Sequence, residues 1–207
     1  MSAKTLEPAT TSPLTRSAGV AAVGAGLWLA VAQLGQLATI DRTDILATSA
    51  DPLFRAFSIA YAAGFFGLMV ALVALYARQA RAAGTFGFVG FCAATLGTMC
   101  LGANMWFEAF CSPWLVAAVP GMLTLEKAPL WQFGYFSSYV LFALGWIVFG
   151  ISTWASRVVP AALAFALVLG GAIGFFAAQP PFAVPLGLAV AALGGWLLRV
   201  DRAAAPR

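Results

Sequence analysis

Six long apolar stretches dominate the chain, at residues 17–40, 56–76, 86–107, 132–154, 158–177 and 182–198. A hydrocarbon core about 30 Å thick needs roughly 20 helical residues to cross it, and most of these stretches are that long. Six crossings return the chain to the side on which it starts. The sequence therefore predicts an all-α integral membrane protein, in which residues 17–199 form a single domain of six transmembrane helices.

Composition argues against a soluble domain. Hydrophobic residues make up 62% of the 207 residues and charged residues only 9%, whereas a soluble domain carries about 25% charged residues. A soluble chain of this length has no core large enough to hide so much apolar surface, so lipid must cover much of it. The net charge of +4 does not indicate a nucleic-acid partner, because the basic residues stand at helix ends rather than on one face.

The basic residues predict the orientation of the chain. Three of them (Arg42, Arg55 and Lys127) fall on the same side of the predicted membrane as most of the acidic residues, and the others fall on the opposite side. Lys and Arg residues that flank membrane spans stay in the cytoplasm. Both termini are therefore expected in the cytoplasm. The cytoplasmic set comprises Lys4, Arg16, Arg78, Arg81, Arg157, Arg199, Arg202 and Arg207.

Two tails flank the predicted domain. Residues 1–16 are rich in Thr, Ser and Pro and are predicted to be a disordered cytoplasmic tail, and residues 200–207 a second cytoplasmic tail. The polar start, the apolar run and the small residues 30–32 also follow the pattern of a cleaved signal peptide. Because apolar sequence continues to Ile40, an uncleaved first span is favoured. Cleavage stays open as the alternative.

The segment 111–131 is predicted to lie at the outer membrane surface. Its apolar core, residues 114–119, is too short to span, and Pro120-Gly121 interrupts it. An apolar loop among the lipid head groups and a functional lid are both compatible with this pattern, and both predict ordered contact with the membrane surface. On the same side, Asp51-Pro52 predicts a helix start, with Asp51 as the N-cap and Pro52 as the first helical residue.

Polar side chains within the predicted spans gather in the outer half of the first four. Gln33 and Gln36 are three residues apart, and Asn104 and Glu108 four apart, so each pair shares a helix face. A carboxylate at the membrane boundary is costly to desolvate and usually faces a partner or a water-filled cavity. Arg55 is the basic side chain at comparable depth. Charge alone therefore predicts an ion pair between Glu108 and Arg55.

Two interpretations of the outer polar groups remain open. They can hold helices together through interhelical hydrogen bonds, or they can line a pocket that opens to the outer side. In the second case the candidate ligand-binding residues are Gln33, Gln36, Arg55, Tyr61, Asn104, Glu108, Gln132 and Tyr135.

Small residues indicate where helices pack closely. Gly170 and Gly174 form a GxxxG pattern, and Ala191 and Gly195 repeat the spacing in the last span. Small residues let helix backbones approach each other in lipid. Packing within one bundle and formation of a homo-oligomer both follow from this pattern.

The residue inventory limits the possible chemistry. The chain has no histidine, which excludes histidine haem ligands, histidine proton relays and Ser-His or Cys-His catalysis. It also has no CxxC pair, no P-loop and no clustered metal ligands, so no cofactor, no metal and no catalytic residue are predicted. Acidic groups at the bilayer midplane, which proton-coupled carriers use, are missing.

These exclusions favour a non-enzymatic membrane component, either a subunit of a larger assembly or a binder of a lipid or small amphiphile at the outer leaflet. The alternative is a small carrier or an intramembrane enzyme with a polar pocket open to the outer side.

Four short segments carry a resemblance to other proteins. They are ALYAR at 74–78, GFVGF at 87–91, FEAF at 107–110 and FALGW at 142–146. Together they resemble a group of uncharacterised bacterial polytopic membrane proteins, over the second to fourth predicted spans. The resemblance implies a multi-pass protein of the bacterial plasma membrane and no particular activity. It also implies that Glu108 belongs to a recurring segment.

Overall fold

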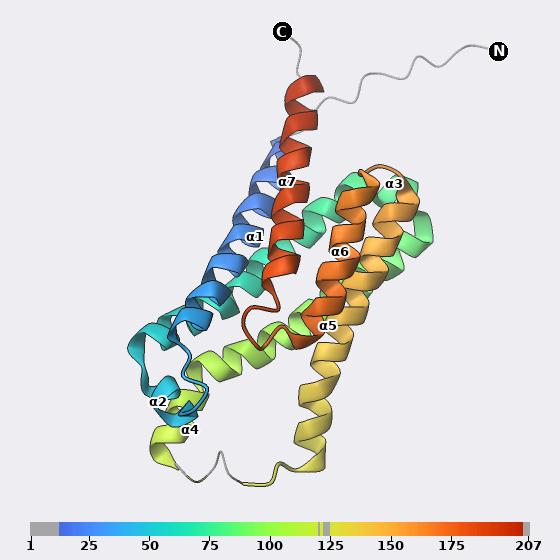
Figure 1. Ribbon diagram of the computed structural model, residues 1–207. Coiled ribbons are helices and arrows are strands. Elements are labelled where there is room, and N and C mark those ends of the chain that lie inside the picture. Colours follow the sequence, from blue (N-terminus) through green and yellow to red (C-terminus); the bar gives the residue numbers. More distant parts are fainter. Residues whose placement is uncertain (1–12, 120, 122–124, 205–207) are drawn as a thin grey trace, which may run out of the picture.

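The computed structural model describes residues 13–119, 121 and 125–204, and this part of the chain is helical without a strand (Figure 1). The predicted all-α class is confirmed. The helices are α1 (Pro13–Thr39), α2 (Ile45–Ala50), α3 (Pro52–Phe110), α4 (Ser112–Ala118), α5 (Pro129–Ser156), α6 (Ala161–Ile173), the 3-10 helix η2 (Gly174–Phe176) and α7 (Val184–Ala204).

Four helices are long and apolar enough to cross a membrane: α1, α3, α5 and α7. The predicted count of six spans differs from this in two places. The predicted spans 56–76 and 86–107 lie in the single helix α3, which has 59 residues. The predicted span 158–177 corresponds to α6 and η2, which together are shorter than the four long helices.

Gly84 divides α3 into two parts. Its φ of 57° and ψ of −149° are non-helical, and a positive φ suits glycine because it has no Cβ. In Figure 1 the first part of α3 rises toward the upper right, and the second part returns toward the lower left. The chain therefore reverses its direction within α3.

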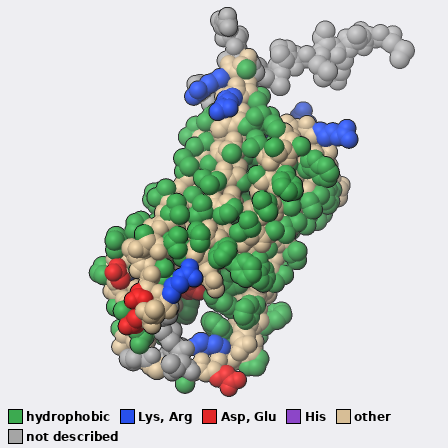
Figure 2. Space-filling model, viewed as in Figure 1, with side chains coloured by type: hydrophobic (Ala, Val, Ile, Leu, Met, Phe, Trp, Pro, Cys, Tyr) green, Lys and Arg blue, Asp and Glu red, His purple; other side chains and the backbone are tan. Residues whose placement is uncertain are grey.

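The helices pack in a closed ring. The α3 helix contacts α1 and α5, α1 contacts α7, α5 contacts α6, and α6 contacts α7. Large aromatic side chains fill the centre, where Phe142, Trp146 and Phe149 are fully buried. The outer surface is also apolar, and side chains such as Phe66 and Leu130 are largely exposed (Figure 2). This inside-and-outside apolar pattern is typical of a protein surrounded by lipid.

Charged side chains lie near the two ends of the molecule (Figure 2). The end at which α1 starts and α7 ends is called here the basic end, and it carries Arg199 and Arg202. The opposite end, with α2 and α4, is called the acidic end, and it carries Asp41, Asp44 and Glu126. Residues 13–16 and 200–204, placed in tails by the sequence, continue α1 and α7, while residues 1–12 and 205–207 lie outside the described part.

Side-chain caps order the segment between α1 and α3. The carboxylate of Asp51 accepts hydrogen bonds from the backbone N–H groups of Leu53 and Phe54 at 2.6 and 2.9 Å, which confirms the predicted N-cap and the helix start at Pro52. Asp44 caps α2 in the same way through the Ala47 N–H. Hydrogen bonds from Thr43 lower the pKa of Asp41.

The basic end contains polar contacts that the sequence analysis missed. Arg78 of α3 forms an ion pair with Asp201 of α7. The adjacent Gln79 is buried and donates a hydrogen bond to the Thr153 hydroxyl of α5 at 2.8 Å. The second predicted span ends at residue 76, whereas α3 continues past it and brings both side chains into the bundle.

The GxxxG segment packs inside the bundle. A Cβ added at Gly170 would lie 2.7 Å from the Cα of Leu186, so α6 and α7 approach closely there. At Gly195, by contrast, an added Cβ meets no described atom within 4 Å. The Gly170 contact is thus an internal helix–helix contact.

Candidate functional site

A cavity of about 710 Å³ lies at the acidic end, among α1, α3, α5 and the short helices α2 and α4. Figure 2 shows the molecule hollowed in this region. Small-molecule sites in proteins usually have volumes of about 300–1,000 Å³. The cavity is therefore large enough for a ligand of the size of a small amphiphile.

Five of the eight candidate residues line this cavity, and three do not. The lining includes Gln36, Tyr61, Asn104, Glu108 and Tyr135. The remaining three, Gln33, Arg55 and Gln132, lie elsewhere: Gln33 is buried, whereas the other two are exposed.

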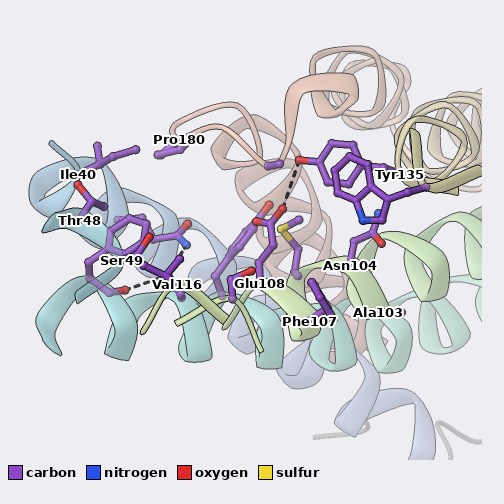
Figure 3. Close-up of a pocket in the computed structure, with 18 of the residues that line it drawn as sticks. Ile40, Thr48, Ser49, Ala103, Asn104, Phe107, Glu108, Val116, Tyr135 and Pro180 are labelled. Atoms are coloured by element: carbon purple, nitrogen blue, oxygen red, sulfur yellow. Dashed lines mark hydrogen bonds between the residues drawn. The ribbon is translucent and has the colours of Figure 1, made fainter. Parts of the chain in front are cut away.

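Glu108 lies near the end of α3 and faces α5 across the cavity. Its carboxylate accepts a hydrogen bond from the Tyr135 hydroxyl at 3.2 Å (Figure 3). The Tyr135 ring stacks on Trp131, with the ring centroids 4.9 Å apart and the planes 12° from parallel. The carboxylate and the two stacked rings thus form one side of the site.

The predicted ion pair between Glu108 and Arg55 does not form. The Arg55 guanidinium is exposed and lies 3.4 Å from the Ser49 carbonyl of α2. Asp51 fixes the start of α3, and Arg55 in the first turn bends back over α2 rather than across the cavity. The similar predicted depth of Glu108 and Arg55 did not identify the partner of Glu108, because the rotation of each helix about its axis decides which side chains face each other.

Gln36 brings an amide group from α1 to the cavity. Its Nε2 donates a hydrogen bond to the Ser58 hydroxyl at 3.1 Å. Its Oε1 is buried and has no hydrogen-bond partner among the described residues. A buried acceptor without a partner is destabilising by about 1–3 kcal/mol, so this oxygen is suited to receive a hydrogen bond from a ligand.

Asn104 joins α3 to α5 at the side of the cavity. Its Nδ2 donates to the Ser138 hydroxyl at 2.5 Å, and Ser138 donates in turn to the Tyr135 carbonyl at 2.7 Å. These bonds hold Tyr135 and Glu108 on facing helices. Asn104 is therefore a positioning residue as well as a lining residue.

Gln33 and Tyr61 anchor the turn between η2 and α7. Both donate hydrogen bonds to the Ala177 carbonyl at 2.6 Å. The Gln33 Oε1 also accepts a hydrogen bond from the Ala183 backbone N–H. Gln33 thus fixes this turn against α1, whereas Tyr61 both anchors the turn and lines the cavity. The exposed Gln132 contacts the Lys127 carbonyl.

Several lining residues were not among the sequence candidates. Ser58, Lys127, Trp131 and Pro180 all line the cavity. Ser58 carries a recognisable signal, because a polar side chain within an apolar span is unusual. The other three come from segments next to helix ends, and no periodicity in the sequence indicates that these segments meet.

The lining combines an acid, amides, hydroxyl groups and aromatic rings, which are groups that bind and orient a ligand. No family model, curated protein or solved structure matches the chain.

Proposed function

We propose that the protein is a non-enzymatic component of a bacterial plasma membrane that binds a lipid or small amphiphile in the cavity at its acidic end. The observation that carries this proposal is the composition of the cavity. Phe54, Phe107 and Leu130 supply apolar lining, and Glu108 and Gln36 supply a few polar groups beside it. An apolar pocket with few, well-placed polar groups is typical of sites for amphiphilic ligands.

The proposal includes six membrane crossings. A straight helix of 59 residues would be roughly 90 Å long, about three times the thickness of the hydrocarbon core. The reversal at Gly84 supports two crossings by α3, at residues 52–83 and 85–110. The other four are α1, α5, α6 with η2, and α7. The surplus of basic residues at the basic end supports a cytoplasmic location for that end and for both termini.

Cysteine labelling tests this orientation. In a variant whose Cys92, Cys100 and Cys111 are replaced by Ala, a single Ala47→Cys change should react with a membrane-impermeant maleimide in intact cells. The matched Ala82→Cys change should react only after the membrane is opened. Both alanines are exposed in the structure. A difference in labelling therefore reports the side of the membrane and not a difference in burial. The opposite labelling pattern would overturn the orientation and would place the cavity in the inner leaflet.

Native mass spectrometry of the protein, released from membranes in a mild detergent, tests ligand binding. We expect the wild-type protein to retain an amphiphile, and Ala103→Trp to lose it because Ala103 lines the cavity and the indole fills it. Ala63→Trp is the matched control, since Ala63 is exposed on the same helix outside the cavity. Equal retention by both variants would mean that the amphiphile binds elsewhere.

A further inference from the structure

The polar groups of the cavity leave hydrogen-bond acceptors without donors. A carboxylate offers about four acceptor positions, and the Tyr135 hydroxyl occupies one of those of Glu108. Gln36 is 8% exposed, and its Oε1 has no partner in the described part of the chain. Glu108 and Gln36 come from different helices, and both line the same cavity.

The charge of Glu108 is also uncompensated by an ion pair. Among the described residues, the ion pair with a nitrogen–oxygen distance below 4.0 Å joins Arg78 and Asp201, and it lies at the other end of the bundle. A carboxylate in the membrane region usually pairs with a cation or faces water. A cationic group of the ligand would supply both the missing charge and the missing donors.

Aromatic rings next to Glu108 point to the same kind of ligand. Trp131 and Tyr135 stack on each other, and both line the cavity. Tyr61 and Phe107 line it as well. Aromatic faces attract cations through the ring quadrupole, and Trp is the strongest of these side chains in this respect.

Lys127 is the basic residue of the cavity lining, and its charge by itself favours an anionic head group. It lies in the segment between α4 and α5, makes a contact of its own, and is not within ion-pair distance of Glu108. An anionic head group near Lys127 would share the cavity with the Glu108 carboxylate and would be repelled by it. The cavity has more hydrogen-bond acceptors than cations. A head group that donates hydrogen bonds therefore fits it better than an anionic head group.

We propose that the occupant of the cavity is an amphiphile with a primary ammonium head group, which donates hydrogen bonds to Glu108 and Gln36. Its apolar tail lies along the aromatic and aliphatic part of the lining. This inference rests on the proposed function, because it names the class of amphiphile that the same cavity binds.

Four probes with the same dodecyl chain separate the head-group chemistries: dodecylammonium, dodecyltrimethylammonium, dodecanol and dodecyl sulfate. Binding of each to the full-length protein in a neutral maltoside detergent is measured as adducts in native mass spectra. We expect dodecylammonium to bind about 10-fold more tightly than the other three, because its N–H groups make charge-assisted hydrogen bonds. The trimethylammonium probe carries the same charge without an N–H donor.

Variants assign the selectivity to the two acceptors. Glu108→Gln should weaken dodecylammonium binding about 10-fold and dodecanol binding much less, because the amide oxygen of Gln still accepts a hydrogen bond from a neutral hydroxyl. Glu126→Gln is the matched control, since Glu126 is exposed at the same end and does not line the cavity. If Glu108→Gln does not yield a folded protein, Gln36→Met provides the second variant, and it should reduce the preference for dodecylammonium several-fold.

The outcomes distinguish this inference from the function on which it rests. Tightest binding of dodecyl sulfate would overturn it in favour of recognition by Lys127. Equal binding of the two cationic probes would overturn the role of hydrogen bonds. Equal binding of all four probes would leave an amphiphile-binding cavity without head-group selection. A failure of every probe to bind, with no native amphiphile retained, would overturn the proposed function itself.

Discussion

Arg78→Gln is expected to lower the free energy of unfolding by about 3 kcal/mol. The Arg78 guanidinium pairs with the Oδ1 of Asp201, whose side chain is 6% exposed, and the Asp201 Oδ2 has no hydrogen-bond partner among the described residues. Removing the guanidinium leaves a buried carboxylate without a cation, which is more destabilising than the loss of the pair itself. Because Arg78 is 24% exposed, the effect should fall at the lower end of the range for buried pairs. Unfolding in detergent by increasing dodecyl sulfate measures it.

The double variant Arg78→Gln/Asp201→Asn tests the mechanism. Its loss of stability should be smaller than the sum of the two single losses, because neither charge is left alone. Arg81→Gln is the control, since Arg81 lies three residues further along the same helix and is exposed. Its effect should stay within about 0.5 kcal/mol. Additive effects of Arg78→Gln and Asp201→Asn would show that the pair does not contribute as described.

The ion pair of Arg78 and Asp201 also shows why the helices were easier to predict from the sequence than the residues at which they end. The long apolar stretches and the Asp51-Pro52 start are strong local signals, and the structure contains both. Residues 77–85 separate the second and third predicted spans, and Arg78 and Arg81 interrupt the apolar sequence there. Residues 77–83 also contain four alanines and a glutamine, which are good helix formers. The helix therefore continues through them until Gly84, and Arg78 and Gln79 enter the bundle.

The candidate site was predictable as a set of polar residues, but not as a set of contacts. Gln36 and Glu108 do line one cavity. Gln33, three residues before Gln36, instead anchors the turn at Ala177. A spacing of three places two side chains near one helix face, but it does not say which neighbouring element each one meets. The same limit applies to Arg55, since the orientation of α3 against α2 depends on packing between distant segments.

Gly26→Ala is expected to destabilise the folded protein by about 2–3 kcal/mol. An added Cβ at Gly26 would lie 2.2 Å from the Gly187 carbonyl oxygen and 2.6 Å from the Ala191 backbone nitrogen. Both are backbone atoms of α7, so no side chain can rotate away, and α1 and α7 would have to separate. Detergent unfolding with and without the change measures the effect.

Gly24→Ala on the same helix is the matched control and should not destabilise the protein. A Cβ at Gly24 meets no described atom within 4 Å. Alanine is favoured over glycine in a helix by about 1 kcal/mol, so this variant should be as stable as the wild type or slightly more stable. If both variants lost the same stability, the loss would come from a shared property of α1 rather than from its contact with α7. A loss of stability at Gly26 without a loss at Gly24 would instead locate the close approach of α1 and α7 at Gly26, because the change in helix propensity is the same at both positions.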